Sequence, residues 1–332
     1  MDGTLLPVGR SAGAAVGPDG ARLVCVADVA AGVPAEGMSA EGMSAGGIPA
    51  EGIPADVAEV LAGLPADVLV LPTPTREALP SLAAALATLR RAGVASAGTD
   101  VVAAEPPGDG GRLARLVAPW GVRLVPDGTT WTLRASGPCA PGRAEAAPAD
   151  HRHLVSGPSA SGKSAFAENL LAAEPCVTYL ATGRQTGPDD EEWARRVAAH
   201  VARRPSWWAS VESRDAAAVL GARRDPAGAG HTALLWDSVG SWLTGVLDEV
   251  GAWDDAPCWS ARVEAEVEAV VRAFGSARGR VVAVTEEVGW GVVPATASGR
   301  LFADLLGRVN QELAEVSDAV TLVVAGRTLD LR

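Results

Sequence analysis

Residues 157–164 have the types and spacing of a phosphate-binding loop. They follow the pattern G-x-x-x-x-G-K-S, after an apolar run at 153–156 and before a helical pattern at 164–173, which is the strand–loop–helix context of such a loop. Its glycines let successive amides point at one anion, and the start of the helix adds a positive dipole. Lys163 is then expected to contact the β- and γ-phosphates of a nucleotide, and the Ser164 hydroxyl to bind Mg²⁺. The residues expected to bind nucleotide are Gly157, Pro158, Ser159, Ala160, Ser161, Gly162, Lys163 and Ser164.

Lys163 is also the only lysine among the 28 lysine and arginine residues of the chain. A general bias toward arginine explains why lysine is scarce elsewhere. Arginine ends in a broad planar fork, whereas lysine is a compact charge on a slim stem. A loop closed by glycines has room only for the second, so we expect that arginine cannot replace Lys163.

A magnesium site also needs a carboxylate at the end of a second strand. The apolar run at 232–236 ends in Asp237, which gives a Walker B pattern. Another run, at 281–285, is followed by Glu286 and Glu287. Ligands collect at the carboxyl ends of strands in open α/β sheets, so both positions are suitable. We favour Asp237 as the Mg²⁺ ligand, and capping of the next turn is the alternative for the two glutamates.

A histidine flanked by arginines forms a second candidate centre. Residues 189–204 predict a helix with an acidic start. Arg196, Arg203 and Arg204 share roughly one face of it with His200. Neighbouring cations keep an imidazole neutral and nucleophilic, and the same arginines suit phosphate oxygens. From these residues alone, a solvated basic face with an incidental histidine is the simpler interpretation.

The region 151–332 alternates apolar runs with amphipathic patterns, which predicts a mostly parallel sheet flanked by helices. Besides the runs already described, strands are expected at 176–181, 208–212 and 320–325, and helices at 189–204, 216–223, 239–250, 260–274 and 300–316. The expected fold class is therefore α/β, with a RecA-like P-loop nucleoside triphosphatase domain.

Residues 1–134 predict a smaller α/β domain, to which the residues alone assign no activity. Its expected strands are 23–29, 68–71, 101–104 and 122–125, and its expected helices 57–64, 80–92 and 112–118. Five Gly/Pro-rich pentads at 31–55 predict a surface insertion, with a binding repeat as the alternative. Residues 135–150 predict a linker, and for His151 and His153, which follow it, we favour a continuation of the linker over a metal site.

Bulk composition excludes several functions. A net charge of −12 disfavours binding to nucleic acid or anionic membranes. The four cysteines lie far apart without a CxxC pair, which is typical of a reducing cytoplasm. No apolar stretch reaches the roughly 20 residues of a membrane span, and the start of the chain lacks a signal-peptide pattern. We therefore expect a cytoplasmic protein without membrane insertion.

From residue 153 to its end, the chain resembles the bifunctional adenosylcobinamide kinase/adenosylcobinamide-phosphate guanylyltransferase family of cobalamin biosynthesis. The matching blocks are 157–170, 179–183, 189–212, 234–244 and 285–326. The last block is the most specific because it contains EVGxGxVP followed by FxDxxGRxNQ.

The resemblance implies two reactions at one nucleotide site. ATP or GTP phosphorylates a hydroxyl of adenosylcobinamide, and GTP then transfers GMP to that phosphate, giving adenosylcobinamide-GDP and pyrophosphate. In the pattern H-x-x-x-R-P, His200 is implied to carry GMP covalently, with Arg196, Arg204 and Glu212 among the nucleotide-binding residues. The resemblance also implies Mg²⁺ as cofactor and a homotrimer.

Several positions depart from the usual family pattern. Pro158 and Ala160 stand where the family loop has Gly and Arg, Glu286 stands for Asn, Ser238 and Gly240 stand for Cys and Thr, and Ala199 stands for a second His. Guanylyl transfer alone, another small-molecule P-loop kinase and a non-catalytic GTP-binding scaffold stay open as alternatives. The N-terminal region resembles a metallo-β-lactamase-like extension that lacks the HxHxDH metal motif.

Overall fold

The computed structural model describes residues 4–8, 12–16, 21–26, 65–106, 108, 111–126, 150–183, 204–222 and 233–332. They belong to two compact units, one of 1–147 with 169–175 and one of 148–168 with 176–332. Four predicted segments lie wholly or mostly outside the described residues: the pentads at 31–55, the helix at 57–64, the linker at 135–150 and the helix at 189–204 with Arg196 and His200. Within the described residues, no helix is long and apolar enough to cross a membrane.

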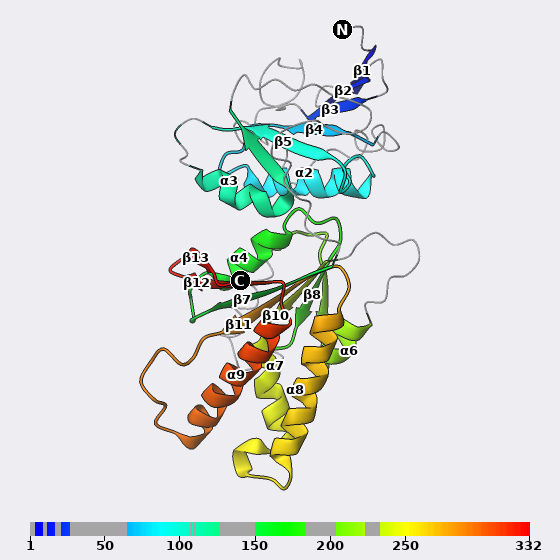
Figure 1. Cartoon of the computed structure of the whole chain (residues 1–332). Helices are drawn as coiled ribbons and strands as arrows, with labels where there is room; N and C mark the ends of the chain where they lie inside the picture. Colours follow the sequence, from blue (N-terminus) through cyan, green and yellow to red (C-terminus); the bar gives the residue numbers. More distant parts are fainter. Residues whose placement is uncertain are drawn as a thin grey trace, which may run out of the picture. The chain divides into compact units, whose positions relative to one another are not determined.

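A seven-stranded sheet forms the second unit, in the order β13-β12-β7-β11-β10-β8-β9. Its neighbouring strands are parallel except for the final hairpin β12–β13. Helices α6 to α9 cover one face of the sheet and α4 the other (Figure 1). The strands are β7 (His151–Gly157), β8 (Val177–Ala181), β9 (Ala209–Glu212), β10 (Ala233–Asp237), β11 (Arg280–Glu286), β12 (Ala319–Val324) and β13 (Arg327–Asp330). The helices are α4 (Lys163–Leu171), α6 (Ala216–Gly221), α7 (Val239–Val250), α8 (Trp259–Ser276) and α9 (Ala297–Glu315).

This arrangement confirms the predicted fold class. Every strand expected beyond residue 150 is present, and so is every helix expected in the described part of that region. Strand β11 separates the P-loop strand β7 from β10, which carries Asp237, and this is the strand order of RecA-like P-loop proteins. The apolar faces of the helices meet the sheet in one core around Trp236, Leu180 and Phe274, because an amphipathic helix must bury its stripe against another element.

The final hairpin was only half predicted. The expected strand at 320–325 ends at Val324, because Ala325 and Gly326 both have positive φ, 50° and 69°, and form the turn. Strand β13 follows, with four exposed residues and no apolar run to reveal it.

The assignment of His151 and His153 to a linker was wrong. Both residues lie in β7, where His151 pairs with Arg280 and His153 pairs with Val282 of β11 and Ala319 of β12. The strand begins earlier than its apolar run because β11 pairs with it from His151 onward, and β12 joins from His153. Within the described residues, no group of three or more His, Cys, Asp or Glu side chains could hold a metal ion.

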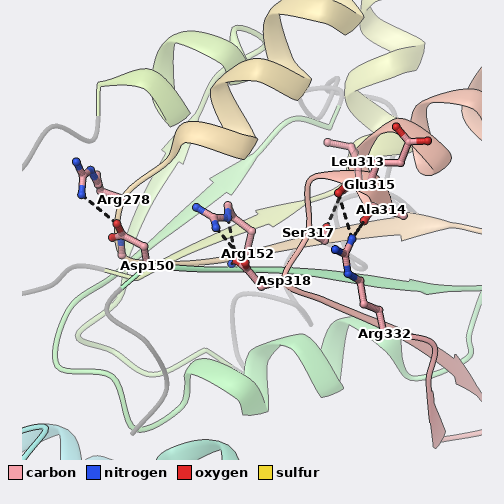
Figure 2. Close-up of polar contacts among 10 residues, drawn as sticks. Asp150, Arg152, Arg278, Leu313, Ala314, Glu315, Ser317, Asp318 and Arg332 are labelled. Carbon is pink, nitrogen blue, oxygen red and sulfur yellow. Dashed lines mark hydrogen bonds and ion pairs between the residues drawn. The ribbon is translucent and has the colours of Figure 1, made fainter.

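Ion pairs fix the beginning of β7, at the end opposite the phosphate loop (Figure 2). Arg152 donates from Nε to Asp318 Oδ2 at 2.8 Å, and its backbone N–H donates to the same oxygen at 2.7 Å. Arg278 Nη1 donates to Asp150 at 3.1 Å. At the end of the chain, Arg332 donates to the last carbonyls of α9, those of Ala314 and Glu315, where a cation also complements the helix dipole.

His153 is the most strongly perturbed histidine of the described residues. Its Nε2 lies 2.8 Å from Thr321 Oγ1, which in turn donates to Asp330 Oδ1 at 3.0 Å. The pKa of His153 is lowered to about 4, mainly by burial and also by the charges of His151 and Arg280, while Asp330 acts in the opposite direction. The imidazole is therefore neutral in the folded protein at neutral pH.

We expect this histidine to make stability depend on pH. Its pKa in the unfolded chain is near 6.5, so below that value protons bind the unfolded state first. The stabilisation is complete above pH 6.5 and is lost as the pH falls toward 4, in total about 3 kcal/mol. Urea unfolding from pH 7 to pH 4 measures the loss, and His153→Gln should remove most of it. A variant with the same pH slope as wild type would contradict this assignment.

The first unit is a six-stranded sheet in the order β1-β2-β3-β4-β5-β6. Strands β1 to β3 are antiparallel, and β3 to β6 are parallel. Strands β1 and β2 were not predicted, because Pro7 interrupts the short apolar run of β1 (TLLPV) and small residues dominate β2 (AGAAV). The described elements are β1 (Thr4–Val8), β2 (Ala12–Val16), β3 (Arg22–Val26), β4 (Val68–Leu71), α2 (Leu79–Arg91), β5 (Asp100–Ala104), α3 (Arg112–Val117) and β6 (Val122–Val125).

Candidate nucleotide-binding site

The phosphate loop has the backbone geometry that its glycines predict. A Cβ on Gly157 would collide with the carbonyl oxygen of Val323, so only glycine fits where β7 ends beside β12. Gly162 has φ of +94°, which L-residues rarely adopt. The carbonyl of Gly162 then accepts from Phe166 N at 3.0 Å, and α4 begins at Lys163. The loop therefore leads directly into a helix amino terminus, a favourable place for phosphate.

Lys163 is buried at the base of this loop, only 9% exposed. Its Nζ lies 3.5 Å from the carbonyl oxygen of Pro158 and 3.9 Å from Glu286 Oε1. Its backbone N–H donates to Ser161 Oγ at 3.3 Å. The ammonium group is thus held within the phosphate loop, with the Glu286 carboxylate as its counter-ion.

The remaining expected site residues gather at the carboxyl ends of adjacent parallel strands. Across the sheet, Ala181 pairs with both Glu212 and Asp237, and Glu286 pairs with Gly157. Asp237 is half-buried, whereas the side chain of Glu212 is exposed. The edge of the sheet that ends in the phosphate loop therefore also carries the three carboxylates, and the strand pattern predicted this placement for Asp237 and Glu286.

A residue that the sequence analysis missed joins two of the expected ones. Tyr179, which is 3% exposed, donates from its hydroxyl to Asp237 Oδ2 at 2.9 Å. The guanidinium carbon of Arg204 lies 3.2 Å from the centroid of the Tyr179 ring, a close cation–π contact. Burial and the Asp237 carboxylate raise the pKa of Tyr179, so the hydroxyl stays a donor. Tyr179 is the only tyrosine of the chain, and this rarity is the one sequence feature that could have pointed to it as a site residue.

The two glutamates after β11 have different environments. Glu287 Oε1 accepts from Ser156 Oγ at 2.8 Å and from Asn310 Nδ2 at 3.4 Å, while its backbone N–H donates to Gly157 O at 3.2 Å. Glu287 thus braces the phosphate-loop strand. It does not cap the following helix, because Thr296 caps α9.

Glu286 points its carboxylate toward Lys163 and the start of α7. Burial raises its pKa; Lys163 and the nearby Ser238 and Gly240 N–H oppose this effect, and Asp237 adds to it. Among the described residues no well-aligned hydrogen bond reaches its buried Oε2.

The donor set at this edge suits a hard divalent cation. The Ser164 hydroxyl and the Asp237 carboxylate offer oxygen atoms, the ligands that Mg²⁺ prefers. Asp237 lies at the carboxyl end of β10 with one oxygen engaged by Tyr179.

Of the remaining predicted site residues, Arg204 and Glu212 are described, whereas Arg196 and His200 lie outside the described residues.

The fold and site together define an α/β P-loop nucleotide-binding protein. Residues 153–331 match the family described as cobinamide kinase/cobinamide phosphate guanyltransferase. The chain belongs to this family of transferases, which confirms the resemblance seen in the sequence. The first 152 residues lie outside the match.

Named relatives show the same relationship. The bifunctional adenosylcobalamin biosynthesis protein CobP of Pseudomonas aeruginosa is 38% identical over 182 residues, 54% of this chain and 97% of that protein. CobU of Salmonella typhimurium, a protein of the same description, is 35% identical over 179 residues, 52% of this chain and 95% of that protein. Among solved structures, an ATPase from the type III secretion system of pathogenic bacteria aligns with a TM-score of 0.36 at 14% identity, covering 52% of this chain and 50% of that chain.

Proposed function

We propose that this protein phosphorylates a hydroxyl of adenosylcobinamide with ATP or GTP and then transfers GMP from GTP to that phosphate. The observation that carries the proposal is the buried Lys163 in a formed phosphate loop, within a region that matches the family along its length. The substrates are taken from the description of the family and the resemblance in the sequence. We also propose that the protein acts as a homotrimer.

In the first reaction, the loop amides and Lys163 would hold the β- and γ-phosphates. Mg²⁺ would be held by Ser164 and Asp237, and when bound it neutralises charge on the phosphate oxygens. The corrinoid hydroxyl forms a bond to the γ-phosphorus as the bond to the bridging oxygen breaks. The hydrogen bond from Tyr179 to Asp237 fixes the orientation of the metal carboxylate.

In the second reaction, His200 would act as the nucleophile. Its neutral imidazole nitrogen forms a bond to the α-phosphorus of GTP, and pyrophosphate leaves. An oxygen of the corrinoid phosphate then attacks the same phosphorus, and the phosphorus–nitrogen bond breaks. Arg204 would neutralise charge on the transferred phosphate, and its contact with the Tyr179 ring, which holds the guanidinium in place, supports this role. Arg196 and Glu212 complete the proposed nucleotide-binding set.

Incubation with GTP labelled at the α-phosphate tests this function. We expect acid-labile label on the protein, and its transfer to the corrinoid once cobinamide and a phosphate donor are present. Mass analysis should then find the phosphate and the GDP derivative of cobinamide. Turnover without labelled protein would exclude the histidine intermediate. Absence of both labelling and phosphorylation would favour a GTP-binding scaffold.

A further inference from the structure

The least expected residue of the site is Glu286, a carboxylate beside a loop that binds anions. Its position in the sheet is fixed because it pairs with Gly157 at the exact end of the P-loop strand. Its Oε1 lies 3.9 Å from Lys163 Nζ, the group expected at the β- and γ-phosphates. The carboxylate is therefore within reach of the phosphate that is transferred.

The backbone that carries Glu286 is held on both sides. Asn310, 8% exposed, donates from Nδ2 to the Glu286 carbonyl at 3.0 Å. Its Oδ1 accepts from the fully buried Thr285 hydroxyl at 2.5 Å. On the other side, Glu287 N–H binds the Gly157 carbonyl. A side chain that leaves such a fixed backbone has few positions to adopt, which favours catalytic alignment.

The second residue of α7, Gly240, lies against the same carboxylate. A Cβ on Gly240 would collide with Glu286 Oε2 and lie 3.1 Å from its Cδ. Gly240 has no positive φ, so its backbone does not require glycine; the Glu286 carboxylate occupies the place that a Cβ would take, and an added Cβ would have to displace it. Glu286 and Gly240 both depart from the usual family pattern described above, and these two residues lie against each other in the structure. Gly240 thus makes room for the longer acidic side chain.

Glu286 is also the glutamate that remains available for chemistry. Glu287 Oε1 is occupied by Ser156 and Asn310. In contrast, Glu286 Oε2 is buried and has no hydrogen-bond partner of normal geometry among the described residues, although the Ser238 side chain and the Gly240 N–H act on the carboxylate as donors that lower its pKa. A buried carboxylate oxygen without a donor is costly, so an incoming hydroxyl would be a favourable partner.

We propose that Glu286 is the general base of the phosphoryl-transfer step and that Gly240 is the residue that lets it reach the attacking hydroxyl. This inference rests on the proposed function. The hydroxyl oxygen attacks the γ-phosphorus while its proton passes to the Glu286 carboxylate. The bond from the γ-phosphorus to the β–γ bridging oxygen breaks, and that oxygen keeps the electron pair. Glu286 then releases the proton to water.

Glu286→Gln tests the role of Glu286 as general base, because glutamine keeps the shape of the side chain and removes the basic carboxylate oxygen. We expect kcat for cobinamide phosphorylation to fall at least about 100-fold, since a positioned base contributes roughly that much. The KM for the nucleotide should stay within threefold, and labelling by GTP should persist, because that step uses His200. Glu266→Gln, on the exposed face of α8, is the matched control and should behave as wild type.

Gly240→Ala supplies an independent probe, because it keeps the carboxylate but displaces it. It should lower kinase turnover at least tenfold in the wild-type background and change it less than threefold in the Glu286→Gln background.

Three outcomes would overturn the role of Glu286 as general base. They are kinase turnover of Glu286→Gln within threefold of wild type, equal loss of kinase activity and labelling in that variant, or rescue of that variant by excess Mg²⁺, which would make Glu286 a metal ligand. Wild type that cannot phosphorylate cobinamide would instead refute the proposed function.

Discussion

Replacing Lys163 by arginine is expected to lower both phosphorylation and guanylyl transfer by about 100- to 1,000-fold, the usual effect of losing one aligned charge at a transition state. The ammonium lies in a buried pocket between the Pro158 carbonyl and Glu286. The wider guanidinium cannot enter where Gly157 and Gly162 bring the backbone close. Steady-state rates of the kinase step and single-turnover labelling by GTP measure the two losses separately.

The matched control is Arg262→Lys, an exchange of the same two residue types on the exposed face of α8. It should leave both rates unchanged. Thermal unfolding should show that Lys163→Arg remains folded, because the defect lies in phosphate binding. If Lys163→Arg kept either rate within tenfold of wild type, the steric argument for the single lysine would be wrong.

His200→Ala is expected to abolish protein-bound label and to lower guanylyl transfer by at least about 1,000-fold, because the attacking atom itself is removed. Phosphorylation of cobinamide should stay within threefold of wild type, since that reaction uses the phosphate loop. Labelled GTP measures the first effect, and mass analysis of the corrinoid the second. The expected product in this variant is therefore cobinamide phosphate, without the GDP derivative.

The chain offers its own control in His231, another histidine that the proposed chemistry does not use. His231→Ala should keep both the label and the transfer. Equal loss of phosphorylation and labelling in His200→Ala would assign that residue to nucleotide binding or folding. Retained label would place the covalent intermediate on another side chain.

Much of the second unit could be predicted from the sequence, because its buried strands are continuous apolar runs. Helix α7 was expected at its observed bounds, and β4 in the first unit likewise. Segments whose own residues carry no apolar signal could not be predicted in this way. Strand β13 is exposed and is defined by its hydrogen bonds to β12, and β7 begins with two histidines that pair with neighbouring strands. Pairing partners distant in sequence decide both cases.

The candidate site shows the same division. The phosphate loop and Asp237 could be predicted, since both follow from local spacing at strand ends. The contacts of Tyr179 with Asp237 and Arg204 join three segments far apart in sequence, so no local pattern reveals them. The different environments of Glu286 and Glu287 likewise depend on Asn310 in α9.

The contact of Tyr179 with both Asp237 and Arg204 has an evolutionary consequence for the proposed enzyme. In the proposed mechanism, one aromatic side chain supports both the carboxylate assigned to the metal and the arginine assigned to the guanylyl group. Selection on either proposed reaction would then preserve the same residue. A lineage that abandoned phosphorylation would still need the ring under Arg204, but would be free to lose the hydroxyl. Phenylalanine at position 179 in a relative would thus mark an enzyme specialised for the second step.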